Sequence, residues 1–180
     1  MKYCSHCGHE VVHIVPPGDN VPRFVCPACG AVHYQNPKLV VGCVAEWQGL
    51  ILLCRRAIEP RKGFWTLPAG FMENGETTQH AALRETAEEA LAEAEGLEPF
   101  ALVNVPHVDQ VHLMFRGHLR DGKHAAGAES LETALFAEQD IPWGEIAFPS
   151  VRYTLERFLE DRRRGGYGFH ITTWEKPAGR

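Results

Sequence analysis

The chain has 180 residues, of which 44% are hydrophobic, and a formal net charge of -5 at pH 7. This length suffices for one domain of ordinary size with a small attachment, and the acidic balance does not favour nucleic acid as a partner. No apolar run approaches the roughly 20 residues that span a bilayer, and the start MKYCSHCGHE lacks the apolar core of a signal peptide, so we expect a cytoplasmic protein with no membrane partner.

Four of the six cysteines form two CxxC pairs near the start of the chain, eighteen residues apart. The four are Cys4, Cys7, Cys26 and Cys29. This spacing predicts a zinc ribbon over residues 1–34, with two turns that each present two thiolates to one structural Zn²⁺. Gly8 and Gly30 follow the second cysteine of each pair, as a turn with a positive φ angle requires.

Two other interpretations of these cysteines remain open. A redox CxxC would need one motif at a helix N-terminus instead of two matched turns. His6, His9 or His33 could replace a cysteine as ligand, although four sulfurs already complete the set. The ribbon has too few apolar residues for a core of its own, so we expect zinc to supply most of its stability. Its few basic residues favour a structural or docking role over nucleic-acid binding.

The next segment predicts a β-hairpin. Residues 38–47 are rich in valine, and residues 50–54 are their expected partner across Gln48-Gly49. Cys43 and Cys54 fall inside these strands and are expected to be small core residues. Arg55 and Arg56 end the second strand, where one guanidinium could bind the phosphate oxygens of a substrate; an exposed strand end is the alternative.

Residues 77–95 predict a helix, because they contain no proline, are rich in Ala, Leu and Glu, and follow a capping threonine, Thr77 or Thr78. We expect one apolar stripe at helical spacing, made of Leu83, Ala87, Ala90 and Leu91. Another face would carry Glu85, Glu88 and Glu89. Taken alone, such a carboxylate face is more often solvated than functional.

The carboxylates belong to a longer pattern, however: Gly70, five residues, Glu76, seven residues, then Arg84-Glu85-Thr86-Ala87-Glu88-Glu89. This pattern resembles the Nudix box, GX5EX7REUXEEXGU with U a bulky aliphatic residue. Thr86 and Ala92 stand where the family has bulky aliphatics, and Leu91 stands where it has glycine. The leucine implies that the helix continues instead of turning at that position.

The resemblance implies a divalent-metal hydrolase. Glu85, Glu88 and Glu89 would bind Mg²⁺ or Mn²⁺ together with the carbonyl of Gly70, and Glu88 and Glu89 would be essential for catalysis. Arg84 would orient the glutamates by ion pairing, supported by Glu76. Some branches of the family use a further glutamate from a loop outside the box to bind metal or deprotonate water, and Glu129 is the candidate here.

The rest of the chain predicts three strands, at residues 97–105, 110–119 and 131–137, and a last helix that starts at Pro149. Its expected apolar stripe consists of Val151, Leu155, Phe158 and Leu159. Three arginines, 162–164, precede Gly165, which is ordinary capping chemistry at a helix end. The tail, residues 166–180, could pack on the body or on a second copy, which leaves a homodimer open.

The resemblance covers residues 38–165 and implies an α/β (α+β) fold, the Nudix α/β/α sandwich with a mixed sheet, preceded by the small ribbon. Together with the ribbon it is similar to the FAD and ADP-ribose pyrophosphatase group. The implied substrate is a dinucleotide or nucleotide sugar, cut to AMP plus the partner's phosphate. Trp65, Phe71 and Phe115 are candidates for stacking on a ring of that substrate, or else core residues.

Two other functions remain open. A second ribbon-containing branch hydrolyses NADH, but its SQPWPFPxS signature is absent here, where residues 104–110 read NVPHVDQ. The chain could also be a catalytically silent module that senses nucleotides or docks a partner, against which the intact glutamates argue.

Overall fold

The computed structural model describes residues 1–175 and forms two compact units, which divide between Pro37 and Lys38. The first unit holds a three-stranded antiparallel sheet in the order β1-β2-β3. Its strands are β1 (Val12–Ile14), β2 (Arg23–Val25) and β3 (Val32–His33). None of the helices within residues 1–175 is long and apolar enough to cross a membrane.

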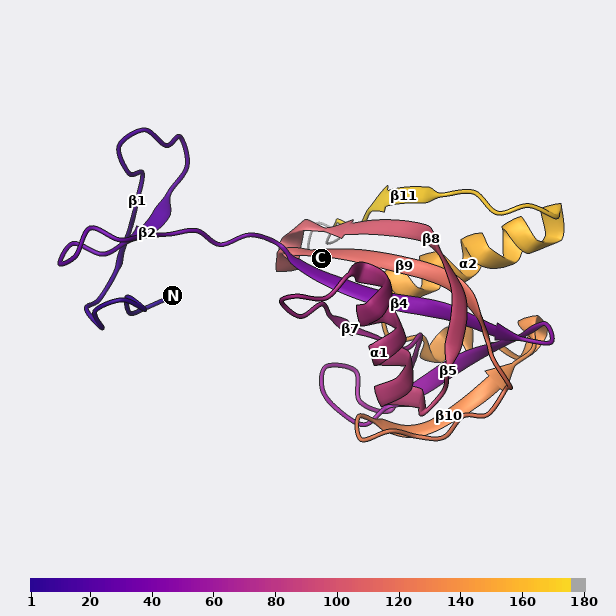
Figure 1. The fold of residues 1–180 in the computed structure, drawn as a ribbon. Helices are drawn as coiled ribbons and strands as arrows, with labels where there is room; N and C mark the ends of the chain where they lie inside the picture. Colours follow the sequence, from indigo (N-terminus) through magenta and orange to yellow (C-terminus); the bar gives the residue numbers. More distant parts are fainter. Residues whose placement is uncertain (176–180) are drawn as a thin grey trace. The chain divides into compact units, whose positions relative to one another are not determined.

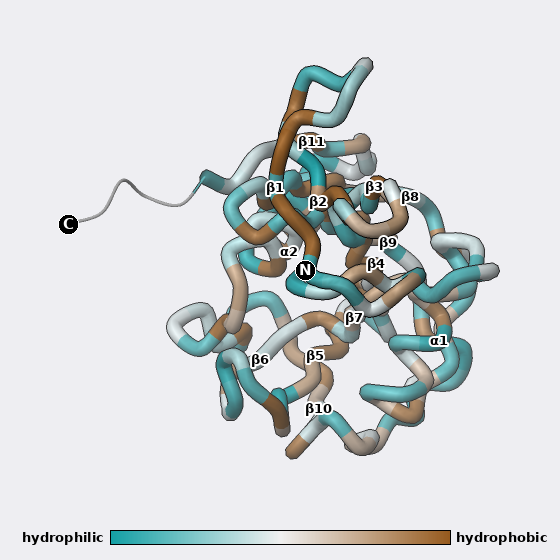
Figure 2. Tube along the Cα trace, turned by 90° about the vertical axis from the view of Figure 1, so that its left-hand side faces the viewer, coloured by the Kyte–Doolittle hydropathy of each residue, from teal (hydrophilic) through white to brown (hydrophobic). Residues whose placement is uncertain are grey.

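Each CxxC pair of the first unit lies on a tight turn closed by the glycine that follows it. The N–H of Gly8 donates to the Cys4 carbonyl at 2.9 Å, and that of Gly30 to the Cys26 carbonyl at the same distance. Both glycines have positive φ angles, 76° and 74°, as the sequence predicts. The hydrophobic residues of β1 in Figure 2 are exposed, so apolar packing contributes little to this unit.

The second unit is built on one mixed sheet in the order β10-β5-β4-β9-β8-β11. Its strands are β4 (Lys38–Trp47), β5 (Leu50–Arg56), β8 (Ala94–Val105), β9 (Gln110–Leu119), β10 (Ser130–Phe136) and β11 (His170–Thr173). The pairs β4/β9 and β8/β11 are parallel and the other neighbours are antiparallel. Two short strands complete it: β6 (Trp65–Thr66) pairs with β5, and β7 (Ala69–Phe71) pairs with β4.

Two helices, α1 (Thr78–Ala90) and α2 (Pro149–Arg164), cover opposite faces of this sheet (Figure 1). Val44, Leu53 and Phe158 belong to the core under α2, whereas the core under α1 includes Cys43 and Cys54. Both cysteines are at most 1% exposed, which confirms them as core residues. The predicted α/β/α sandwich with a mixed sheet is therefore correct. The connections carry three 3-10 helices: η1 (Pro106–Val108), η2 (Glu138–Asp140) and η3 (Trp143–Glu145).

Helix α1 differs from its prediction at its end and on its faces. Its N-cap is Thr77, whose hydroxyl accepts from the N–H of His80 at 3.2 Å, but it stops at Ala90 because Leu91 adopts a left-handed conformation with φ 45°. The expected continuation through Leu91 is wrong. The predicted apolar stripe is wrong as well: Ala87 and Leu91 are exposed, and the buried face carries Glu85, Thr86 and Glu89.

The other elements follow the sequence with small shifts. Strand β8 starts three residues earlier than expected, since the early end of α1 frees residues 94–96, and its register is irregular beside Glu95. Helix α2 has the predicted apolar stripe, and its end is capped by Gly165 with φ 77°. Two of the three basic residues that end it, Arg162 and Arg163, pair with Glu138, as expected for a helix end in a folded domain.

The segment after α2 returns to the sheet as β11, which pairs in parallel with β8. Asp161 anchors it: its carboxylate accepts from the N–H of Gly168 at 2.9 Å and lies 2.7 Å from Nε2 of His170. Burial alone would raise the pKa of Asp161, but these two partners together hold that pKa below its usual range. The last five residues of the predicted tail, 176–180, lie outside the described residues.

Candidate active site

The carboxylates of α1 meet the backbone of β7 at Gly70. A side chain on Gly70 would overlap the carboxylate of Glu85, so glycine is the residue that lets strand and helix approach this closely. The next residue along the helix face, Glu89, accepts a hydrogen bond from the N–H of Ala69 at 3.1 Å. Two glutamates of the box are thus packed directly against β7.

Arg84 connects four parts of the site. Its guanidinium contacts Glu76 and Glu85 at 2.7 Å each and Glu88 at 3.1 Å, and it donates to the carbonyl of Phe71 at 3.2 Å. The hydrogen bonds from Arg84 lower the pKa of Glu76 to about 2, and the Glu76 carboxylate in turn raises the pKa of Arg84. A charged, bidentate network of this kind fixes the direction of the carboxylates.

The three glutamates differ in exposure. Glu85 and Glu89 are 8% and 6% exposed, whereas the side chain of Glu88 is 60% exposed. Burial raises the pKa of Glu85, and burial raises that of Glu89 to about 7, against the Ala69 hydrogen bond that lowers it. Arg84 pairs with Glu85 but not with Glu89, so two buried carboxylates have only one cation in contact with them. Burying the second charge is costly, and a bound metal ion would relieve that cost.

The loop of residues 121–129 closes the end of α1. Its N–H groups at Ala125 and Gly127 donate to the carbonyls of Ala90 and Glu89, at 2.8 and 3.0 Å, which satisfies backbone groups that a helix end leaves unpaired. A side chain on Gly127 would overlap the Glu88 carbonyl. The loop then carries Glu129 to the site, where its charge contributes to the raised pKa of Glu85 and of Glu89.

A cavity of about 1060 Å³ opens beside these groups. Most residues singled out from the sequence line it: Arg56, Gly70, Phe71, Arg84, Glu85, Glu88, Glu89 and Glu129. Glu76 supports Arg84 from outside the lining. The box and the loop glutamate, which are far apart in the sequence, therefore face one space of a size that accommodates a nucleotide.

The two strand-end arginines have different environments. Arg56 lines the cavity, with its guanidinium over the ring of Phe148 and its Nε bonded to the Pro60 carbonyl. Arg55 lies outside the lining and pairs instead with Glu132 at 3.5 Å and with the Gly63 carbonyl at 2.9 Å. Arg55 is thus not placed to bind a ligand in this cavity, since alternate residues of a strand point to opposite faces.

The aromatic candidates also separate. Trp65 is 7% exposed and packs edge-on against Phe136, and Phe115 is fully buried, so both are core residues. Phe71 lines the cavity, is 49% exposed and carries Lys38 over its ring.

Sequence reasoning missed four other ring-bearing residues of the lining: His107, His112, Phe148 and Trp174. They come from η1, β9, the residue before α2 and the residue after β11. Only the tertiary fold brings these segments together, so no local signal could have found them.

The carboxylates suit a hard cation. Glu85, Glu88 and Glu89 and the Gly70 carbonyl offer only oxygen donors, which Mg²⁺ and Mn²⁺ prefer. Their oxygens are not drawn together in a cage, because among residues 1–175 only the four cysteines form a set of metal-binding side chains with all donor atoms within 4.8 Å. The open arrangement fits Mg²⁺, which keeps several waters and rarely takes an all-protein cage.

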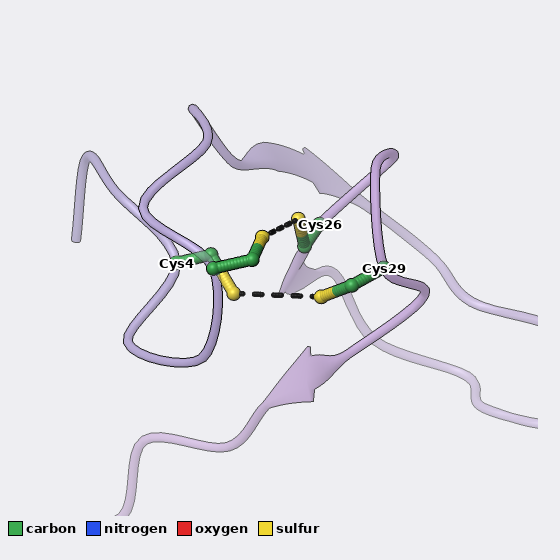
Figure 3. A group of neighbouring side chains, drawn as sticks. Cys4, Cys26 and Cys29 are labelled. Atoms are coloured by element: carbon green, nitrogen blue, oxygen red, sulfur yellow. Dashed lines mark hydrogen bonds between the residues drawn. The ribbon is translucent and has the colours of Figure 1, made fainter.

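The cysteine set of the first unit fits zinc. Cys4 Sγ lies 3.7 Å from Cys29 Sγ, and Cys7 Sγ lies 3.4 Å from Cys26 Sγ (Figure 3). Four sulfurs at a Zn–S distance of about 2.3 Å in a tetrahedron lie roughly 3.8 Å apart, close to these values. A hydrogen bond from the Cys29 N–H lowers the pKa of Cys26 to about 7, whereas the pKa of Cys7, although the His9 N–H lowers it, is raised to about 12 by Cys26 and by burial. The thiols therefore do not all ionise by themselves, and a bound Zn²⁺ would hold the four as thiolates.

The histidines of this unit do not displace a cysteine from the set. His33 is the nearest candidate, with Nε2 3.3 Å from Cys4 Sγ. Its ring therefore contacts a sulfur of the cluster from outside the four. The matched turns and the clustered sulfurs together support a structural zinc ion. The redox interpretation requires a CxxC pair at a helix N-terminus, and both pairs lie on turns instead.

Comparison with known proteins agrees with both units. Residues 2–35 match the family described as Nudix N-terminal, a zinc ribbon, and residues 36–152 match the family described as NUDIX domain. An ADP-ribose pyrophosphatase of Methanocaldococcus jannaschii is 30% identical over 140 residues, which cover 73% of this chain and 76% of that protein. The NAD-capped RNA hydrolase NudC of Escherichia coli is 26% identical over 161 residues, 89% of this chain and 59% of NudC.

A solved structure extends the agreement to the whole fold. The NUDIX hydrolase from Nitrosomonas europaea is 50% identical and superposes with a TM-score of 0.94, covering 98% of this chain and all of that one. The geometry of the box, the ribbon and these matches lead to one conclusion: the chain belongs to the Nudix family, as a pyrophosphohydrolase with an N-terminal zinc ribbon.

Proposed function

We propose that this protein is a Mg²⁺- or Mn²⁺-dependent hydrolase that cuts the pyrophosphate bond of a nucleoside diphosphate linked to another moiety. FAD and ADP-ribose are the preferred substrates, and the products are AMP and the partner's phosphate. The observation that carries the proposal is the cavity whose lining combines the box glutamates and Arg56 with aromatic side chains. The ADP-ribose pyrophosphatase among its relatives supports the choice of substrate.

The residues divide the work of the reaction. Glu85, Glu88, Glu89 and the carbonyl of Gly70 would hold the metal, which supplies charge neutralisation of the diphosphate and a more acidic water. Arg84 would keep Glu85 and Glu88 in position through the ion pairs described above.

Two further groups act on substrate and water. Arg56 is the one strand-end arginine in the cavity, and its guanidinium suits phosphate oxygens. Glu129 reaches the site from the loop of residues 121–129 and is exposed, so it can accept a proton from an attacking water without first losing a partner.

A second candidate function has a specific observation behind it. The relative NudC matches 89% of this chain, including the ribbon, and its name gives NAD-capped RNA as its substrate. This chain spans only 59% of the length of NudC. The SQPWPFPxS signature of the NADH branch is absent from residues 104–110, and the net charge of -5 gives no attraction to RNA, so we place NADH and NAD-capped RNA second.

The deciding measurement is kcat/KM for FAD, ADP-ribose, NADH, NAD-capped RNA and nucleoside triphosphates at equal metal concentration. We expect FAD or ADP-ribose to be cleaved most efficiently. More efficient cleavage of NADH, NAD-capped RNA or a triphosphate would reject the choice of substrate but not the hydrolase.

The Glu88→Gln, Glu89→Gln double variant tests the hydrolase itself. It should lose most turnover and keep the folded circular dichroism spectrum, since Glu88 is exposed and neutralising buried Glu89 removes a costly charge. Full metal-dependent activity in this variant would reject the assignment of these glutamates. A wild-type protein that binds these nucleotides and cleaves none of them would instead support the catalytically silent module.

A further inference from the structure

The cavity ends far from the glutamates, at a tryptophan delivered by the C-terminal strand. Strand β7, with Gly70, pairs with one edge of β4, and β9, β8 and β11 follow in order from the other edge. Four strand spacings of about 4.8 Å, roughly 19 Å of sheet, thus lie between β7, where Glu85 packs, and the end of β11, where Trp174 lines the same cavity. A diphosphate held at the glutamates would carry its nucleoside toward this far wall.

The backbone of Trp174 is fixed, although it lies six residues from the chain's last residue. Its N–H donates to the carbonyl of Asn104 in β8 at 2.8 Å. The Asn104 amide donates in turn to the Thr172 carbonyl at 3.2 Å and to Thr173 Oγ1 at 3.3 Å. With Asp161 anchoring the other end of β11, the backbone from which the indole projects is fixed at both ends of the strand.

Trp174 is 40% exposed, and within residues 1–175 its indole makes none of the ring–ring or cation–ring contacts that Phe71, Phe148 and Tyr167 make. A large aromatic face that lines a cavity and stacks on none of the described residues is suited to a planar ring of a ligand. The neighbouring lining at Val105 and Val108 is apolar, which favours a base or a flavin over a charged group.

We infer that Trp174 stacks on the aromatic ring of the nucleotide and thereby selects substrates that carry such a ring. The identity of the substrate in this inference rests on the proposed function, whereas the position of the stacking site rests on the structure alone. Stacking of a base on an aromatic side chain corresponds to about a 5- to 150-fold difference in Kd.

The test compares two ligands that share one end. We would measure Kd by calorimetry, with Mg²⁺, for α,β-methylene-ADP and for methylenediphosphonate, which has the same diphosphonate group and no nucleoside. Trp174→Ala should weaken α,β-methylene-ADP about 5- to 150-fold and leave methylenediphosphonate unchanged, and Trp174→Phe should restore most of the affinity. Ile171→Ala is the matched control, because Ile171 is 64% exposed on the same strand and lies outside the cavity lining.

Three results would overturn the inference: unchanged affinity for α,β-methylene-ADP in Trp174→Ala, equal loss of both ligands, or the same loss in Ile171→Ala. Failure of the proposed function looks different. In that case neither FAD nor ADP-ribose is hydrolysed by the wild-type protein, while the affinity for α,β-methylene-ADP still depends on Trp174.

Discussion

Gly70 offers the sharpest test of the site, because the smallest possible side chain there is already too large. A Cβ at residue 70 would overlap Glu85 at both carboxylate oxygens, and Glu85 is buried and paired with Arg84. Gly70→Ala must therefore displace the Glu85 carboxylate by about 1 Å to reach ordinary contact distance. The carbonyl of residue 70, which we propose as a metal ligand, is kept in this variant, so the perturbation acts on the glutamate.

The cost can be estimated from that displacement. Overpacking of this size destabilises a protein by about 1–3 kcal/mol, which lowers Tm by roughly 2–12 °C at this chain length. Misplacing a catalytic group by about 1 Å costs about 100-fold in rate, so kcat/KM should fall by that order while the protein remains folded. Gly144→Ala is the control, since a side chain there meets nothing within 4 Å, and it should change neither quantity.

A second substitution locates the effect at Glu85. Aspartate is one methylene shorter, so Glu85→Asp should relieve the overlap, and Gly70→Ala with Glu85→Asp should be more stable than the sum of the two single changes predicts. Thermal unfolding and steady-state kinetics on the four proteins measure this coupling. Wild-type kcat/KM in Gly70→Ala, or strict additivity of the two changes, would refute the reasoning.

Three further predictions concern other parts of the molecule. Arg56→Ala should raise KM for the pyrophosphate substrate about tenfold or more, whereas Arg55→Ala, next to it but outside the cavity, should leave kinetics unchanged; equal effects would refute the assignment. The pKa of Asp161 is lowered in the folded state, so its stabilising contribution is present above the ordinary aspartate range and is lost as pH falls through the folded pKa. Asp161→Asn should therefore reduce the free energy of unfolding in urea at pH 7 and differ little from wild type near pH 2, and a constant difference across this range would contradict it. Removal of zinc by a strong chelator should broaden the NMR amide signals of the ribbon, residues 1–34, and of no other part. A mild Mg²⁺ chelator should stop turnover and leave those signals unchanged. Purified protein that contains no zinc while its four ribbon cysteines are reduced would count against the ribbon.

Elements that depend on local chemistry could be predicted from the sequence. The two cysteine turns follow from spacing and the glycines after them, and the start of α1 follows from Thr77. The apolar stripe of α2 was correct because Val151, Leu155, Phe158 and Leu159 are all buried against the sheet, as hydrophobic burial at helical spacing predicts. The roles of the box residues came from resemblance, and the structure adds that these residues share one cavity.

The faces of α1 could not be predicted in the same way. Helical periodicity assigns carboxylates to solvent, but Glu85 and Glu89 are buried because each has a partner: Arg84 of the same helix pairs with Glu85, and the N–H of Ala69 in β7 donates to Glu89. Thr86 is fully buried for a related reason, since its hydroxyl donates to the Ala82 carbonyl at 2.8 Å. A site that must hold charge in the interior reverses the pattern on which the sequence argument relied.

The end of α1 shows how a distant segment decides a local question. Leu91 is a poor residue for a left-handed conformation, which costs an L-residue roughly 1–2 kcal/mol, and nothing near it in the sequence requires the helix to stop. The loop of residues 121–129 supplies the reason, because its N–H groups at Ala125 and Gly127 bind the carbonyls at the helix end. The same contacts bring Glu129 up to the box glutamates. The left-handed backbone of Leu91 is thus tied to the loop that brings Glu129, the candidate base from outside the box, to the box glutamates.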